Sequence, residues 1–271
     1  MRLTISHQTT YTYDSPDAYA LLQLRLKPRD GHGQRVVDWS TTVTGGTTQG
    51  RFDDEHGNHV ELILVDPDTT ELSIASSGVV EVEDRAGVVG EHKAFTPLWL
   101  YEAPTAMTAP GKALRKLAAQ MKPLPDEDQL ARMHRLSAAI TAQMRYETGR
   151  TDATTTAEEA LSAGHGVCQD FAHVMIATAR LLGIPARYIS GYLLMADRED
   201  QDAAHAWAEV WVERLGWIGF DPANEICPDD RYVRVAVGCD YKDAAPVHGI
   251  RQGHGTEDLT VTLKVQSQTG Q

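Results

Sequence analysis

Gly164-His165-Gly166-Val167-Cys168-Gln169-Asp170-Phe171 places one cysteine between a glycine-flanked turn and an apolar helical pattern. From Phe171 onward, apolar residues recur every three or four positions until Gly183 and Pro185 end the pattern. This spacing predicts a helix with one buried face and with Cys168 in its first turn. The free N–H groups and the positive dipole end of a helix stabilise a thiolate, so Cys168 is the candidate nucleophile. The alternative is a small residue that merely begins a helix.

The composition is that of an ordinary globular protein with one large domain or two smaller ones. Of 271 residues, 42% are hydrophobic and 23% are charged, and the net charge of -13 argues against a broad basic surface for nucleic acid. No apolar run approaches the length of a membrane span, and the first residues enter a strand pattern in place of a signal peptide. Three cysteines are few and odd in number. We therefore expect a cytoplasmic protein that binds neither nucleic acid nor membranes.

The first part of the chain carries the two-residue alternation of antiparallel strands. Strand-like runs separated by turn residues lie at 3–13, 37–43, 59–65, 72–75 and 79–83. They predict a β-sandwich over residues 1–90, and nothing in it looks catalytic.

Residues 91–110 follow as a connector, because prolines and glycines prevent one regular element and the aromatic side chains between them need a surface to pack on. Residues 111–271 are the expected catalytic domain. Amphipathic helices are predicted over 114–121 and 130–144, the second capped by Asp126 with Gln129. Thr156 and Glu159 form a capping box for a third helix. Strands are expected over 186–195, 204–212 and 216–220, which makes this domain α+β.

A thiol nucleophile needs a nearby base and a group that orients the base. His205 is the first histidine on a strand-like segment after the cysteine helix. Alternation turns His205, Trp207 and Glu209 to one face and small apolar residues to the other, which is expected to pack on the cysteine helix. Asp221 ends the next strand, because Pro222 cannot continue the ladder. The sequence does not fix the register, so contact between His205 and Asp221 stays open.

The other histidines and cysteines offer weaker alternatives. His173 lies about 140° around the helix from Cys168 and does not share its face. A zinc site of His165, Cys168 and His173 lacks a fourth ligand and any Cys-x-x-Cys pair. Cys227 and Cys239 are read as free small residues. We expect neither a metal nor a cofactor.

Four segments together resemble the bacterial transglutaminase-like superfamily. They are GVCQDFAH at 166–173, IPARYISGY at 184–192, HAWAEV at 205–210 and GWIGFDP at 216–222. The resemblance extends to the N-terminal β region, the surroundings of Tyr146, the loop at 241–255 and the alternating strand at 259–265. It implies an α+β fold in which an antiparallel β-sandwich precedes a papain-like core, with the cysteine at the start of a helix packed on an antiparallel sheet.

The resemblance also implies a triad in which Cys168 is the nucleophile, His205 the base and Asp221 the residue that orients His205. Cys168 would attack an amide carbonyl and hold the acyl group as a thioester until water or an amine resolves it. The Cys168 N–H is the first oxyanion donor, and Tyr146 and Gln169 are candidates for the second. Trp207 is a further substrate-site candidate, as the wall of an acyl tunnel.

We therefore expect a peptide or protein substrate and hydrolysis, as a cysteine peptidase or amidase. Transfer of a glutamine acyl group to an amine, by a transglutaminase, is one alternative. A catalytically silent interaction module is the other. The oligomeric state is not predicted.

Overall fold

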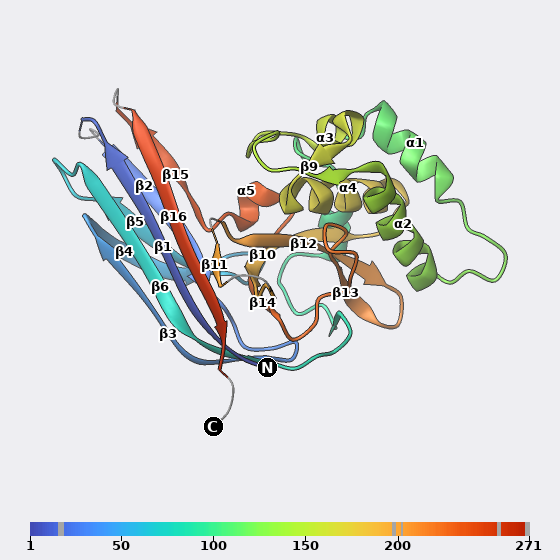
Figure 1. Cartoon of the computed structure of the whole chain (residues 1–271), viewed down its shortest axis with the longest axis horizontal. Coiled ribbons are helices and arrows are strands. Elements are labelled where there is room, and N and C mark those ends of the chain that lie inside the picture. The colour runs from blue at the N-terminus through green and yellow to red at the C-terminus, as the bar shows by residue number, and fades with distance from the viewer. Residues whose placement is uncertain (16–18, 197–198, 202, 254–255, 269–271) are drawn as a thin grey trace.

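A computed structural model describes residues 1–15, 19–196, 199–201, 203–253 and 256–268. It contains an antiparallel β-sandwich beside an α+β core, with most of the helices on the side of the core away from the sandwich (Figure 1). The predicted fold class is confirmed.

Two antiparallel sheets form the sandwich. Its strands are β1 (Arg2–Tyr13), β2 (Tyr19–Lys27), β3 (Gln34–Thr44), β4 (Gly46–Asp53), β5 (His59–Val65), β6 (Glu71–Val82), β11 (Asp200–Gln201), β15 (Val247–Gln252) and β16 (Glu257–Ser267). The sheet orders are β11-β16-β1-β6-β3 and β15-β2-β5-β4. Apolar residues of both sheets, including Leu24, Ile63 and Ile74, meet in one cluster between them.

The C-terminal strands belong to these sheets. β16 pairs with β1 from Leu3 opposite Ser267 to Tyr13 opposite Glu257, and β15 pairs with β2. The sequence predicts that residues 111–271 form the catalytic domain and that 241–255 form a loop, whereas both strands join the sandwich. The difference has a physical cause, since the alternation of a strand shows that it pairs and does not show its partner. The division at residues 90 and 110 stays a prediction.

The core is an antiparallel sheet covered by helices. Its strands, in the order β14-β10-β12-β13-β7, are β7 (Val88–Gly90), β10 (Ala186–Leu193), β12 (His205–Val212), β13 (Gly216–Phe220) and β14 (Tyr232–Gly238). The helices are η1 (Leu98–Glu102), α1 (Lys112–Gln120), α2 (Gln129–Gln143), α3 (Ala157–Ala163), α4 (Cys168–Leu181) and α5 (Tyr241–Ala244), and a short parallel pair joins β8 (Arg145–Tyr146) to β9 (His165–Gly166).

Helix α4 lies at the centre of the core. All of its residues from Asp170 to Arg180 are buried, and it packs on β12. Ala206, Ala208 and Val210 of β12 share a hydrophobic cluster with α4, as the alternation of β12 predicted. The surrounding helices and the sheet therefore fix the position of the first turn of α4.

Capping shows one success and one error of the sequence analysis. Thr156 and Glu159 form the predicted capping box of α3. For α2, however, Asp128 is the cap, and its side chain accepts a hydrogen bond from the Ala131 N–H at 2.8 Å. Asp126 is excluded because its φ of 60° places it in the turn before the helix.

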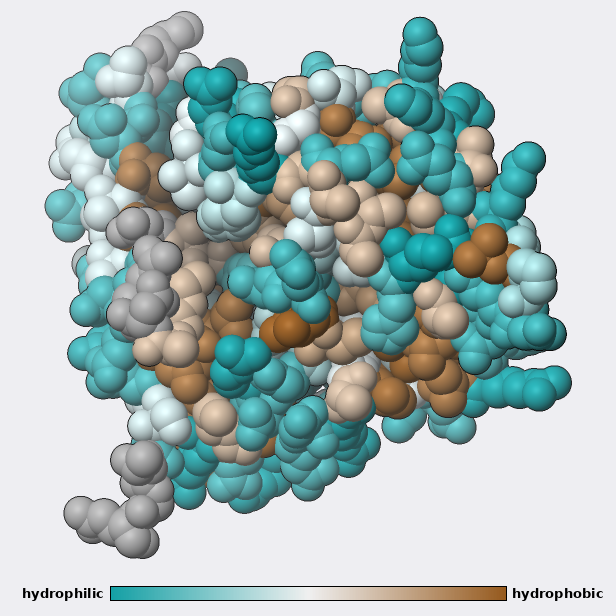
Figure 2. Space-filling model, turned by 45° about the vertical axis from the view of Figure 1, so that its right-hand side comes forward, coloured by the Kyte–Doolittle hydropathy of each residue, from teal (hydrophilic) through white to brown (hydrophobic). Residues whose placement is uncertain are grey.

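The connector packs on the core through part of its aromatic content. Tyr101 in η1 is fully buried, edge-on against the ring of Trp217. Phe95 and Trp99 are instead 93% and 67% exposed, so they do not serve as the predicted packing residues. On the face shown in Figure 2, hydrophilic residues predominate and apolar residues form separate patches. None of the described helices is both long and apolar enough to cross a membrane.

Candidate functional site

The structure brings His205 and Asp221 together at one end of the core sheet. The register of β12 and β13 pairs Ala208 with Phe220, so Asp221 follows directly beyond the paired strand end. His205 Nε2 donates to Asp221 Oδ2 at 2.6 Å, and both side chains are almost completely buried. The contact that the sequence left open is therefore present.

Asp221 also accepts hydrogen bonds that the sequence analysis missed. Asn224 Nδ2 and the Tyr232 hydroxyl donate to Oδ2 at 2.7 and 2.8 Å, and the Ala223 N–H donates to Oδ1 at 3.1 Å. Burial favours a raised pKa for Asp221, but the hydrogen bonds from His205, Asn224 and Tyr232 outweigh it and lower the pKa. Asp221 is thus held as a carboxylate. Asn224, three residues after Asp221, could have been found in the sequence, whereas Tyr232 comes from a separate strand.

Cys168 is the first residue of α4 and is half-buried. Asp170 holds the start of this helix, because its Oδ2 accepts from the Val167 N–H at 2.8 Å and from the Thr151 hydroxyl at 2.7 Å. Gly166 lies so close to Asp170 that a Cβ there would come within 2.6 Å of its side chain. A glycine before the cysteine therefore allows the capping carboxylate to approach.

His205 connects Cys168 to Asp221. Burial by itself would lower the pKa of His205, but the charge of a Cys168 thiolate and the hydrogen bonds to Asp221 and Cys168 raise it to about 10. The imidazole is thus stabilised as a cation, with the Asp221 carboxylate as its partner. A thiolate beside an imidazolium is the reactive form of a catalytic cysteine.

Cys168 and His205 line a cleft of about 410 Å³ between the core and the sandwich. The sandwich contributes seven lining residues from β1, β11, β15 and β16, namely His7, Thr9, Tyr11, Gln201, Val247, Leu259 and Val261. The expectation that the sandwich carries no catalytic side chain stays a prediction, but the sandwich does form one wall of the cleft. No Asp, Glu, Lys or Arg is among the described residues that line it.

The predicted substrate-site residues lie in two different places. Tyr146 and Gln169 line the cleft, and the pairing of β8 with β9 sets Tyr146 beside Gly166. Trp207 is not among the described residues that line this cleft. It is buried, its ring lies 6.2 Å from that of His205, and it lines a cavity behind the sheet. Trp207 faces away from Ala206, which does line the cleft, whereas His205 lines the cleft from the first position of β12.

The remaining histidines and cysteines have other surroundings. His173 is fully buried, and its Nε2 accepts from the Tyr241 N–H at 3.1 Å. Burial lowers the pKa of His173 to about 3, so it is neutral. Burial raises the pKa of Cys227, and burial with nearby Asp243 raises the pKa of Cys239 to about 12. Both thiols are therefore protonated near neutral pH.

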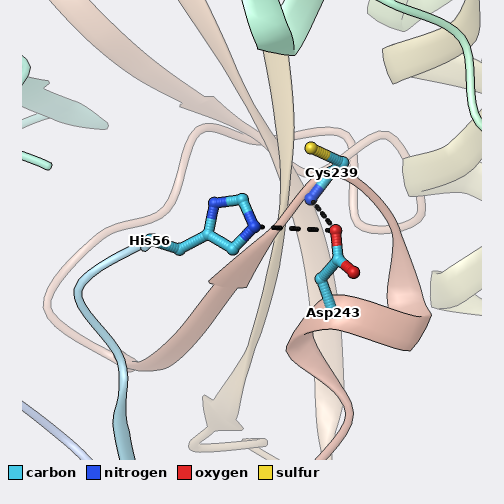
Figure 3. Close-up of side chains that lie close together, drawn as sticks. All are labelled: His56, Cys239 and Asp243. Carbon is cyan, nitrogen blue, oxygen red and sulfur yellow. Dashed lines mark hydrogen bonds and ion pairs between the residues drawn. The ribbon is translucent and has the colours of Figure 1, made fainter. Parts of the chain in front are cut away.

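One cluster offers potential metal ligands. His56, Cys239 and Asp243 each present a ligand atom, and these atoms lie within 4.8 Å of one another (Figure 3). Hydrogen bonds already account for the group, because His56 Nδ1 bonds the Tyr101 hydroxyl at 2.8 Å and the Cys239 N–H donates to Asp243 at 2.9 Å. The cluster fastens a loop of the sandwich to the core.

Comparison with known proteins identifies both parts of the chain. Residues 115–222 match the model of the transglutaminase-like superfamily, and residues 3–81 match that of the bacterial transglutaminase-like N-terminal region. An uncharacterized protein of Mycobacterium leprae is 31% identical over 97% of this chain and 98% of its own length. An uncharacterized protein of Mycobacterium tuberculosis is 30% identical over 92% and 87%.

Two further proteins bear on the core. A protein-glutamine gamma-glutamyltransferase of Pseudomonas aeruginosa is 34% identical, over 24% of this chain and 11% of its own length. The crystal structure of a Cytophaga hutchinsonii protein, provisionally described as a cysteine protease, superposes with a TM-score of 0.76 at 22% identity. It covers 100% of this chain and 92% of the other. At this identity the superposition shows a shared fold.

Proposed function

The chain belongs to the transglutaminase-like superfamily, and we propose that it is a cysteine-dependent amide hydrolase, a peptidase or amidase, with Cys168, His205 and Asp221 as its catalytic residues. One observation carries the proposal. His205 bonds Asp221 at 2.6 Å on one side and Cys168 on the other, and Cys168 and His205 line the same cleft. This is the arrangement that nucleophilic catalysis by a thiol requires.

In the acylation step, the Cys168 thiolate attacks the carbonyl carbon of the substrate amide. The N–H of Cys168, at the start of α4, stabilises the developing oxyanion. The His205 imidazolium then gives its proton to the leaving nitrogen as the C–N bond breaks. An amine or ammonia departs, a thioester remains on Cys168, and His205 is neutral.

In the deacylation step, neutral His205 removes a proton from a water molecule, which attacks the thioester carbonyl. The C–S bond breaks, a carboxylic acid leaves, and the thiolate and imidazolium are restored. Asp221 stabilises the imidazolium before acylation and after deacylation without giving up its own charge. Tyr146 and Gln169 are the proposed sources of the second oxyanion donor, since both line the cleft.

Labelling with a small amount of iodoacetamide at about pH 6 tests the nucleophile, because an ordinary thiol with a pKa of about 8.5 is almost wholly protonated there. We expect mass spectrometry to find the label on Cys168 alone and His205→Ala to abolish the selectivity. Peptide cleavage or ammonia release should disappear in Cys168→Ala and persist in the matched variant Cys227→Ala. Equal, slow labelling of all three cysteines would instead identify an inactive interaction module.

Amine transfer is the second candidate, favoured by the local similarity to the Pseudomonas aeruginosa glutamyltransferase. The same acyl-enzyme would then be resolved by a primary amine. A labelled amine and a glutamine donor peptide distinguish the two reactions. Incorporation that exceeds hydrolysis would establish a transglutaminase, and release of ammonia or peptide without any added amine would establish the hydrolase.

A further inference from the structure

A second cavity, of about 320 Å³, lies behind the catalytic sheet. Tyr188 and Ala206 face the Cys168 cleft, whereas their neighbours Arg187 and Trp207 line this second cavity. Successive residues of a strand point to opposite faces, so the two spaces lie on opposite sides of the sheet. Residues of the sandwich, among them His32, close the cavity from the other side.

The inner wall of this cavity contains a buried group of three charges. Arg187 is 3% exposed and Glu209 is fully buried, and Arg234 lies beside them. Arg187 Nε donates to Glu209 Oε2 at 2.7 Å, and Arg234 Nε donates to Oε1 at 2.8 Å. Within the described part of the chain, every side-chain hydrogen bond and ion pair of the two arginines goes to Glu209.

Two guanidinium cations therefore share one carboxylate, which leaves one positive charge without an anion in contact, beside a buried Arg187 and an Arg234 side chain that is 22% exposed. Such a charge is costly unless it is paired. The guanidinium carbon of Arg187 lies 3.9 Å from the centre of the Trp217 ring, which stabilises the cation from one face. The ring does not accept hydrogen bonds from the guanidinium N–H groups, which point outward in the guanidinium plane. His32 is neutral and does not change this charge balance, because burial and Arg234 lower the pKa of its imidazole.

The other charged residues around the cavity have partners elsewhere or offset one another. Asp229 pairs with Arg231, Glu83 with Arg85 and Arg29 with Asp53, and Asp30 accepts from the Val36 N–H. Glu91 and Lys93, both exposed, carry opposite charges at the rim. The carboxylates at the rim, among them the exposed Asp30, therefore offset this positive charge only from a distance, and Glu209 is the carboxylate that contacts Arg187 and Arg234.

We propose that this cavity binds an organic carboxylate, whose charge pairs with Arg187 and Arg234 and whose apolar part packs on Trp207 and Tyr232. A monoanion matches the excess of one charge, and a planar carboxylate matches the donor fork of a guanidinium. The two aromatic side chains line the cavity and supply an apolar surface for the rest of the ligand. The site is separate from the Cys168 cleft, although Tyr232 also donates a hydrogen bond to Asp221.

Calorimetric titration at fixed ionic strength, with benzoate and its neutral isostere benzamide, tests this site. Charge-assisted hydrogen bonds should make benzoate bind about tenfold to a hundredfold more tightly than benzamide. N-acetylphenylalanine and its amide form a second pair. If the carboxylate binds more tightly than the amide only in this second pair, the ligand is a peptide C-terminus. If benzoate also binds more tightly than benzamide, the ligand is a small organic acid.

Arg234→Gln should remove the preference for the carboxylate. This variant keeps Arg187 and Glu209 as a balanced pair, so it is expected to fold, which circular dichroism checks. Arg85→Gln is the matched control, because it removes a positive charge that lines the same cavity and is already paired with Glu83 at 3.0 Å. Equal binding of both members of each pair, no saturable binding in the millimolar range, or tighter binding of inorganic phosphate would overturn the proposal. So would an unchanged preference in Arg234→Gln.

Discussion

At the scale of single residues, Cys168 and Asp221 together set the protonation of His205. His205 has its pKa raised to about 10, so the imidazolium persists far above the ordinary histidine value of 6.5. Because acylation needs this proton, we expect kcat/KM to fall only near pH 10. This fall is the alkaline limb of the pH profile. Asp221→Asn should move the alkaline limb to lower pH and reduce kcat about a hundredfold or more. The measurement is the pH profile of peptide or amide hydrolysis.

Two further variants separate this electrostatic effect from general damage. Tyr232→Phe removes one hydrogen bond to Asp221 and keeps the carboxylate charge beside His205, so it should not move the alkaline limb to lower pH. Asp229→Asn is the control, since Asp229 pairs with Arg231 and does not contact His205 or Asp221. An alkaline limb that stays in place in Asp221→Asn would show that this carboxylate does not set the protonation of His205.

At the scale of elements, the turn before α4 determines where Cys168 lies. Gly166→Ala would place a Cβ 2.6 Å from the Asp170 side chain, which is buried and bonds the Val167 N–H. We expect the helix start to shift, the free energy of unfolding to fall by about 1–3 kcal/mol and iodoacetamide labelling of Cys168 to slow. Gly50→Ala is the control, because nothing lies within 4 Å of a Cβ there. Unchanged stability and labelling in Gly166→Ala would refute this role.

Helices, caps and strand faces are predictable from the sequence where the contacts that determine them are local. The helix after Cys168, the capping box of α3 and the faces of β12 follow from spacing along a few residues. The His205 contact needed the register of β12 and β13, which only the folded structure supplies. The partners of β15 and β16, and the approach of Tyr232 to Asp221, depend on segments far apart in the sequence.

At the scale of the whole molecule, the sandwich and the core are fastened together by buried polar contacts. His7 Nδ1 on β1 forms a 2.9 Å hydrogen bond with the Tyr192 hydroxyl on β10, and Asn58 bonds the backbone of Val237 through both side-chain atoms. Leu3 and Ile5 pack with Val233 in one cluster across the boundary. The cleft beside Cys168 thus exists only when both parts are docked, because each supplies one wall.

Acid should weaken this docking through His7. Burial lowers the pKa of His7 from 6.5 to about 4, so below pH 6.5 the unfolded chain binds a proton that the folded chain excludes. The contribution of neutral His7 to the free energy of unfolding is fully present above pH 6.5 and is lost as the pH falls toward 4. Between about pH 7.5 and pH 5 this one histidine should cost about 2 kcal/mol of the free energy of unfolding.

Urea unfolding of the wild type and of His7→Gln at both pH values isolates the contribution of His7, because all other titrating groups are common to the two proteins. Glutamine still offers a hydrogen bond to Tyr192 but does not titrate, so the variant should lose about 2 kcal/mol less on acidification. His248→Gln, at an exposed position of β15, should lose as much as the wild type. If His7→Gln and the wild type lose the same stability, His7 is protonated equally in the folded and unfolded states, and acid acts on the interface elsewhere.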